Sequence, residues 1–373
     1  MPKAFTPIRV GAMDLAQRIA MAPMTRFRAD DAHVPLPIMK DYYQQRAVVS
    51  RSLIITEATF ISPRAGGYDN IPGIYNDEQI AMWRKVTDAV HAKNSYIVLQ
   101  LWALGRAADP SVLGRDQLPV VSSSATPMMP EKPAPRALNE SEIHEFIQDY
   151  AQAAKNAVKA GFDTVEIHGA NGYLIDQFTQ DTCNTRNDKW GGSVENRSRF
   201  TLEVTKAVVD AIGAERTGIR LSPWSSFQGM RMKDVVPQFT HLAKELAKFK
   251  LAYVHLVESR ISGPGDMPQS ADKLDFFLQA YGNASPVIVA GGYTANKIDE
   301  ALEKTYSDYD VIVGIGRYFT SNPDLIYRIR QGIPLRPYER EHFYTPKDPC
   351  GYIDYDFSRE WECCEADEGG CQP

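Results

Sequence analysis

Several features that mark particular classes of protein are missing from this sequence of 373 residues. No apolar run approaches the ~20 residues of a membrane-spanning helix, and the start, MPKAFTPIRV, lacks the apolar core of a signal peptide. An excess of positive charge is also missing, because 41 Lys and Arg residues against 47 Asp and Glu residues leave a net charge of −6. A basic nucleic-acid-binding surface therefore has no support in the composition. We expect a soluble, cytoplasmic protein that binds neither nucleic acid nor a membrane.

Cysteine is rare as well, and the spacing of the five cysteines does not fit a metal site. Cys183 and Cys350 are isolated, and the other three lie in the acidic C-terminal stretch WECCEADEGGCQP. Zinc sites use Cys or His pairs on both sides of a loop, and this stretch contains no histidine. We expect no metal, and we expect residues 360–373 to form a disordered acidic tail with free thiols.

Short apolar runs recur along the chain, with helical patterns between and after them. Most runs are continuous rather than alternating, which is typical of parallel strands covered on both faces. The eight runs are RIAMAP (18–23), SLIITEAT (52–59), YIVLQLW (96–102), TVEIHG (164–169), TGIRLSP (217–223), LAYVHLVE (251–258), PVIVAGG (286–292) and DVIVGIGR (310–317). Eight strand–helix repeats predict an α/β fold, a single (β/α)8 TIM barrel domain over residues 1–373.

A doubly wound sheet is the alternative fold, but it requires a glycine fingerprint that MAPMTRFRAD does not contain. Two departures from a minimal barrel are expected. Residues 1–17 would form an N-terminal hairpin at the barrel bottom, and the proline-rich residues 103–138 would form a long loop after strand three. The most regular helical pattern, residues 139–161, opens on either Asn139 or Ser141 as its N-cap.

Glycine-rich turns follow the last two predicted strands, in VAGGY (289–293) and GIGR (314–317). The loops after these strands commonly bind phosphate in (β/α)8 enzymes, through backbone N–H groups. Arg317 adds a guanidinium that can bind a phosphate in a bidentate manner. The glycines could instead serve only to make tight turns, but two such loops together favour a phosphate site.

The stretch VEIHGANGYLIDQF (165–178) places His168, Asn171 and Tyr173 within six residues of one another at a strand end. His168 and Asn171 could direct two N–H donors at one carbonyl or nitro oxygen, which polarises the double bond conjugated to it. A phenol has a pKa near 10 in water, so Tyr173 can donate a proton at neutral pH. The alternative is that His168 is a hydrogen-bonded structural residue.

Gln100 and Arg220 lie on predicted inner strands and have side chains that could bind a planar ring with amide and carbonyl edges. The arginine could also stabilise negative charge on such a ring. Alternatively, Arg220 could form a structural ion pair with Glu166 or Glu57. Residue types alone do not decide between these roles.

The assembled motifs resemble those of the Old Yellow Enzyme family of FMN-dependent ene-reductases. The resemblance runs in order from about residue 5 to residue 357 and leaves the acidic tail uncovered. Its motifs are MAPMTRFRAD, ISPRAGGYDNIPGIY, QLWALGRAADP, VEIHGANGYLIDQF, NTRNDKWGGSVENRSRF, GIRLSP, VHLVE, GRYFTSNPDL and FYTPKDPCGYIDY. Within the family, RFRADDAHVPLP and LGRAADP are most similar to filamentous-fungal members.

The resemblance implies tight, noncovalent binding of FMN. Thr25 would hydrogen-bond the flavin O4 edge, Gln100 the pyrimidine edge, and Arg220 the N1/O2 region, where it would stabilise the anionic reduced flavin. Glycines and Arg317 would hold the phosphate. The complete set implied is Pro23, Thr25, Ala58, Gln100, Arg220, Gly291, Gly292, Gly316 and Arg317.

The resemblance also implies that His168 and Asn171 bind the substrate oxygen and that Tyr173 protonates the substrate. The aromatic walls of the substrate site would be Trp102, Phe227 and Tyr344. Many members have a second histidine in place of the asparagine.

Three positions depart from the best-known yeast members. Ala58 stands where they have glycine, Trp224 where they have tyrosine, and Gly292 where they have asparagine. These departures leave the shape of the pocket open.

The implied activity is reduction of the C=C bond of α,β-unsaturated aldehydes, ketones and related acceptors, with NADPH as co-substrate. One alternative is a pathway-specific fungal alkaloid reductase of the chanoclavine-I aldehyde type. A barrel that binds flavin without turnover and a flavin-free aldolase or isomerase are rivals. The expected partners are small unsaturated molecules, and the expected assembly is a monomer or homodimer.

Overall fold

The computed structural model describes residues 2–263, 265–266 and 272–366, and it confirms the (β/α)8 barrel. Eight strands close into one barrel, each parallel to its neighbours, and each of the eight apolar runs overlaps one strand. The strands are β3 (Ile19–Met21), β4 (Leu53–Phe60), β5 (Tyr96–Trp102), β8 (Thr164–Gly169), β9 (Thr217–Leu221), β10 (Tyr253–Val257), β13 (Val287–Ala290) and β14 (Val311–Ile315).

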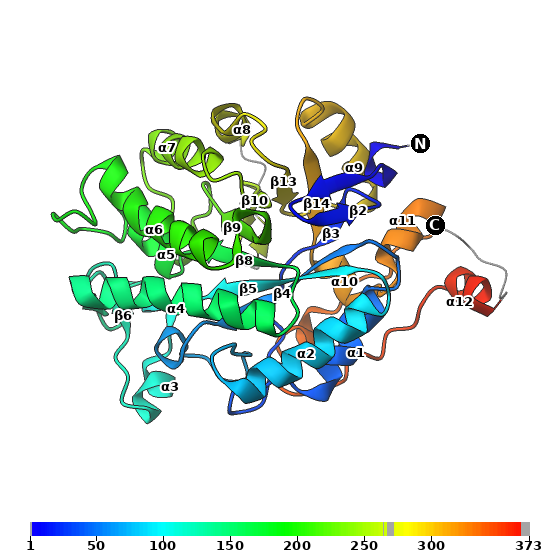
Figure 1. Cartoon of the computed structure of the whole chain (residues 1–373), viewed down its shortest axis with the longest axis horizontal. Helices are drawn as coiled ribbons and strands as arrows, with labels where there is room; N and C mark the ends of the chain where they lie inside the picture. The colour runs from blue at the N-terminus through cyan, green and yellow to red at the C-terminus, as the bar shows by residue number, and fades with distance from the viewer. Residues whose placement is uncertain (1, 264, 267–271, 367–373) are drawn as a thin grey trace.

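Helices surround the barrel, and several of those that follow one another along the chain pack side by side (Figure 1). The larger ones are α1 (Pro37–Arg46), α2 (Asp77–His91), α4 (Glu140–Lys159), α6 (Val194–Ile212), α7 (Val235–Ala247), α8 (Asp275–Tyr281) and α11 (Leu325–Gln331). Shorter helices are α3 (Pro110–Arg115), α5 (Leu174–Thr179), α9 (Ala295–Glu300) and α10 (Arg317–Ser321). Within the described ranges, no helix has both the length and the apolar character to cross a bilayer.

Helix α4 shows how the local sequence sets an element boundary. Asn139 is its N-cap: the Asn139 side chain accepts from the backbone N–H of Glu142 at 2.9 Å, and Glu142 accepts from the backbone N–H of Asn139 at 2.9 Å. This reciprocal capping box decides between the two candidates in favour of Asn139 over Ser141. The apolar face of α4, which includes Phe146 and Tyr150, is buried.

The N-terminal hairpin is present and covers the barrel bottom. Strand β1 (Ile8–Val10) pairs antiparallel with β2 (Met13–Leu15). The inward side chains of the hairpin form one apolar cluster with barrel residues such as Leu53, Val98 and Ile312. The bottom of the barrel is therefore filled by packed side chains, which leaves the opposite end for chemistry.

The long segment after β5 is more regular than the sequence indicated. It contains α3 and a short pair of strands, β6 (Val121–Ser122) and β7 (Arg136–Ala137). The buried Arg106 fixes this segment to the loop after β9, since its guanidinium donates to the carbonyl oxygens of Thr126, Pro127 and Gln228. The two loops therefore pack as one unit.

The disorder predicted for residues 360–373 is wrong for the part that the structure describes. Residues Arg359–Ala366 form α12, and the Trp361 ring packs edge-on against Tyr327 with 5.1 Å between ring centroids. Cys363 is a free thiol, but Cys364 is disulfide-bonded, so the free-thiol prediction fails for Cys364. The remainder of the predicted tail, 367–373, lies outside the described residues.

Candidate functional site

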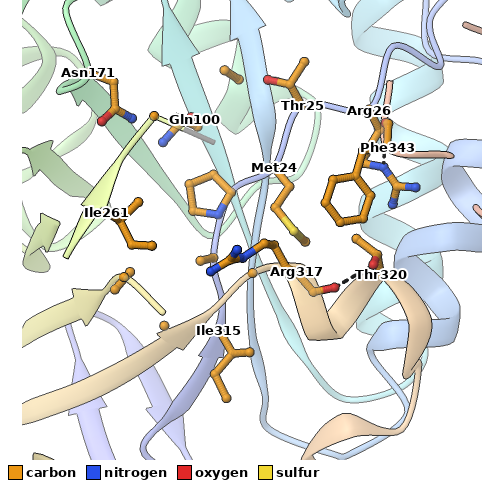
Figure 2. A pocket seen from close by; sticks show the side chains of 18 of the residues that line it. Met24, Thr25, Arg26, Gln100, Asn171, Ile261, Ile315, Arg317, Thr320 and Phe343 are labelled. Carbon is orange, nitrogen blue, oxygen red and sulfur yellow. Dashed lines mark hydrogen bonds between the residues drawn. The ribbon is translucent and has the colours of Figure 1, made fainter. Parts of the chain in front are cut away.

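A cavity of about 800 Å³ lies at the C-terminal ends of the barrel strands, and all of the predicted site residues line it. Figure 2 shows Gln100, Asn171 and Arg317 reaching into the cavity from different parts of its wall. The predicted residues found in its lining are Pro23, Thr25, Ala58, Gln100, Trp102, His168, Asn171, Tyr173, Arg220, Phe227, Gly291, Gly292, Gly316, Arg317 and Tyr344. The barrel thus brings together residues that lie more than 300 positions apart in the sequence, such as Pro23 and Tyr344.

Polar side chains from four neighbouring strands form the floor of the cavity. Gln100 on β5 lies opposite Glu166 on β8, and Arg220 on β9 lies opposite His255 on β10. The Gln100 amide Nε2 donates to Glu166 Oε1 at 2.6 Å, and His255 Nδ1 lies 2.8 Å from Glu166 Oε2. Gln100 and Arg220 line the cavity above this buried pair.

Arg220 is not held in a direct ion pair with Glu166 or Glu57 among the described residues. Its Nε is buried and has no hydrogen-bond partner within that part of the chain. Burial lowers the pKa of Arg220, opposed by the charge of Glu166, but a guanidinium stays protonated in proteins. The structure therefore favours a ligand-facing donor over the structural ion pair.

The loops after β13 and β14 form the other end of the cavity. Gly291 and Gly292 have φ angles of 137° and 69°, which side chains other than glycine rarely adopt. A Cβ at Gly291 would lie 2.8 Å from the Glu258 Cβ, and one at Gly316 would lie 3.3 Å from the Met24 sulfur. Glycine thus serves the turns and also brings bare backbone to the cavity wall, where Arg317 adds positive charge.

His168 presents one defined nitrogen to the cavity. Its Nδ1 accepts from the backbone N–H of Ala170 at 3.3 Å, so the proton of the neutral ring lies on Nε2. Burial, and then the charges of Arg220 and His255, hold the pKa of His168 well below its usual value. The imidazole is therefore neutral at physiological pH and acts as an N–H donor.

The turn that carries Asn171 is fixed by backbone hydrogen bonds. Asn171 and Gly172 both have left-handed φ angles, 58° and 76°, which asparagine and glycine tolerate best. The Asn171 N–H donates to Ser222 Oγ at 2.8 Å, and its carbonyl accepts from the Gln228 side chain at 2.9 Å. With its backbone held in this way, Asn171 extends its amide into the cavity (Figure 2).

Tyr173 is the N-cap residue of helix α5 and packs between aromatic neighbours. Its ring stands perpendicular to Trp102 with 4.8 Å between centroids, and its centroid lies 5.0 Å from that of His168. Burial, with smaller contributions from Tyr68 and Tyr344, raises the pKa of Tyr173. The phenol is therefore protonated at neutral pH and lies beside the two N–H donors.

The aromatic walls differ in their exposure. Trp102 is buried, whereas Tyr344 is 49% exposed and lies at the cavity mouth. Of the three positions that left the pocket shape open, Ala58 and Gly292 line the cavity. Trp224 is not among the lining residues, and its indole N–H donates to the carbonyl oxygen of Lys273 at 3.0 Å.

Sequence reasoning missed the residues that hold the mouth in place. The buried Arg26 donates to the carbonyl oxygens of Phe343 at 3.1 Å and Gly351 at 2.8 Å, and Arg28 donates to that of Asp348 at 2.9 Å. These bonds tie the C-terminal segment that carries Tyr344 to the loop that carries Thr25. The arginines of TRFR were the only sequence signal, and they have no visible partner until the chain is folded.

The donor set fits FMN. Gln100 and Arg220 line the part of the cavity that a polar ring edge would occupy, and Arg220 has a buried Nε without a hydrogen-bond partner among the described residues. The glycine loops with Arg317 would provide a phosphate-binding end. Among the described residues, no group of three or more His, Cys, Asp or Glu side chains could hold a metal ion.

Comparisons with known proteins agree with this geometry. A family model described as NADH:flavin oxidoreductase / NADH oxidase matches residues 3–336. A chanoclavine-I aldehyde reductase of Penicillium roqueforti is 66% identical over 97% of this chain and 98% of its own. An NADP-dependent oxidoreductase of Aspergillus flavus is 54% identical over 96% and 97% of the two chains. The crystal structure of an Old Yellow Enzyme from Pichia sp. is 40% identical, covers 96% of this chain and 94% of its own, and superposes with a TM-score of 0.89.

Proposed function

Because the chain belongs to the NADH:flavin oxidoreductase / NADH oxidase family, as an FMN-dependent oxidoreductase of the Old Yellow Enzyme type, we propose that it is an NADPH-dependent ene-reductase. Its substrates are α,β-unsaturated aldehydes, ketones and related acceptors. The observation that carries this proposal is the meeting of two N–H donors, His168 and Asn171, with the protonated Tyr173 in one cavity. The name of the Aspergillus flavus relative supports NADPH as the reductant.

The side chains divide the reaction between them. Bound FMN supplies the hydride chemistry. His168 Nε2 and the Asn171 amide donate to the substrate oxygen, which withdraws electrons from the conjugated double bond and makes its β-carbon electrophilic. Tyr173 gives its proton to the α-carbon, and the phenolate that remains recovers a proton before the next turnover. Trp102 and Phe227 line the cavity and would restrict water around the acceptor.

The second candidate is a pathway-specific reductase of a chanoclavine-I-type aldehyde. Two relatives from Penicillium roqueforti, 66% and 50% identical, carry that name. A conjugated aldehyde oxygen would use the same donors as any other enal, so this candidate narrows the substrate without altering the roles of the residues. Relatives named as probable inactive reductases or dehydrogenases are 51% identical or less, so turnover requires direct measurement.

The test is a pair of anaerobic measurements on purified protein. NADPH should bleach the flavin absorption faster than NADH does. Enals, enones, maleimides and nitroalkenes, with chanoclavine-I aldehyde among the enals, should then restore it. Bleaching that no acceptor reverses would contradict ene-reduction, and a flavin that NADPH cannot bleach would indicate a binding protein without turnover.

We further expect acid-released cofactor to be FMN rather than FAD. The glycine loops and Arg317 end the cavity in a phosphate site, and the sequence contains no second dinucleotide motif to receive an adenylate. Chromatography of the released flavin against FMN and FAD standards measures this. Recovery of FAD, or of flavin that remains attached to the denatured chain, would contradict noncovalent FMN binding.

A further inference from the structure

A polar layer crosses the interior of the barrel directly beneath the cavity. Interiors of (β/α)8 barrels are usually filled by branched apolar side chains. Here Glu166 and His255 are each 0% exposed, and both contribute to this layer. A buried carboxylate is costly unless hydrogen bonds and nearby charge compensate it, so its position requires a physical reason.

Glu166 fixes the orientation of a residue that lines the cavity. An ionised carboxylate only accepts hydrogen bonds, so the group that Gln100 directs at Glu166 Oε1, 2.6 Å away, is its amide NH₂. The carbonyl of the same amide is thereby turned away from Glu166. His255 Nδ1 hydrogen-bonds the other carboxylate oxygen, Oε2, at 2.8 Å. The two hydrogen bonds together leave the Glu166 carboxylate little freedom to rotate.

Glu166 also offsets the charge of Arg220. Burial alone would raise the pKa of Glu166, but His255, Arg220 and Gln100 together lower it, so the carboxylate is ionised at neutral pH. Burial lowers the pKa of His255, and the charge of Glu166 opposes this effect. Arg220 and Glu166 thus place opposite charges close together in this layer, with Arg220 on the cavity side.

We propose that Glu166 is a positioning residue that sets the reduction potential of bound FMN, by partly neutralising Arg220 and by orienting Gln100. Reduction places negative charge on the flavin ring system. Arg220 stabilises that charge, and the carboxylate behind Arg220 weakens the effect. The proposal requires that FMN binds and does not require that an alkene is reduced.

The experiment is a potentiometric titration of FMN bound to Glu166→Gln, without any alkene. Glutamine keeps the volume and one acceptor for Gln100 but removes the negative charge. The equilibrium should move toward reduced flavin by at least tenfold, which corresponds to about 30 mV in the positive direction for a two-electron couple. Glu166→Asp keeps the charge, so its equilibrium constant for flavin reduction should remain within about threefold of the wild-type value.

Asp324 offers a matched control outside the cavity lining. It is also buried and paired with an arginine, Arg328, whose Nε donates to it at 2.6 Å. Asp324→Asn removes a comparable buried charge. It should leave the equilibrium constant for flavin reduction within about threefold of the wild-type value.

Three outcomes would overturn the proposal. The first is an equilibrium constant for flavin reduction in Glu166→Gln that stays within threefold of the wild-type value. The other two are a shift in Asp324→Asn, or in Glu166→Asp, as large as the shift in Glu166→Gln. If Glu166→Gln does not fold, the double variant Glu166→Gln/His255→Gln replaces it, because two amides can hydrogen-bond each other in the same place. The same tenfold shift is expected there. Failure of the protein to reduce alkenes would contradict the proposed function and leave this measurement intact.

Discussion

Replacing Tyr173 with phenylalanine should slow reoxidation of the reduced protein by an enone about 10²–10⁴-fold, the usual contribution of a positioned general acid. Reduction of the flavin by NADPH should stay within a few-fold of wild type, because that step transfers a hydride and needs no proton from the phenol. The variant thus separates two half-reactions that share one cavity.

The packing around Tyr173 makes this substitution a clean test. Phenylalanine keeps the ring that contacts Trp102 and His168 and removes only the hydroxyl. Because burial raises the pKa of Tyr173, the wild-type phenol stays protonated across the neutral pH range. Ionisation of Tyr173 should therefore not slow reoxidation as the pH rises through that range. Stopped-flow absorbance can follow each half-reaction separately.

Tyr150→Phe is the matched control. Tyr150 is buried in α4, and its hydroxyl has no hydrogen-bond partner among the described residues, so both half-reactions should be unchanged. Equal slowing of the two half-reactions in Tyr173→Phe would mean that the phenol shapes the pocket. No slowing of either would mean that water or another side chain is the acid.

The barrel and the location of the site could be predicted because the relevant signals are local. Continuous apolar runs mark strands covered on both faces, and a polar residue near the end of such a run, such as His168, lies at the active-site face whichever strands are its neighbours. The sequence allows both Asn139 and Ser141 as caps, since only the folded geometry shows which side chain accepts from the first turn of the helix.

The remaining features depend on strand register and on long-range contacts. The pairing of Glu166 with Gln100 and His255 follows from the neighbouring strands of the closed barrel, whose register the apolar pattern does not specify. Arg26 finds its carbonyl partners more than 300 residues away. The acidic composition of the tail gave no indication of α12 or of the packing of Trp361 against Tyr327 and Phe357.

The second large effect is expected at the oxygen-binding donors. Phenols should bind the oxidised protein as phenolates and produce a long-wavelength charge-transfer band with the flavin. Replacing His168 and Asn171 together with alanine should abolish the band and weaken phenol binding about 10²–10⁴-fold. That range follows from two hydrogen bonds to a charged oxygen, each worth roughly 1.5–3 kcal/mol.

The pH dependence of the charge-transfer band shows whether the protein raises or lowers the apparent pKa of the bound phenol. Hydrogen bonds to the charged form lower the apparent pKa of the bound phenol, so in wild type the band should develop at a lower pH than the ionisation of the free phenol. Since burial already keeps His168 neutral, its donor persists as pH rises and the band should not fade through this group. Each single alanine variant should retain a weakened band, and the flavin spectrum without phenol reports whether FMN is still bound. A band of undiminished strength in the double variant, with FMN in place, would show that His168 and Asn171 line the cavity without binding the oxygen.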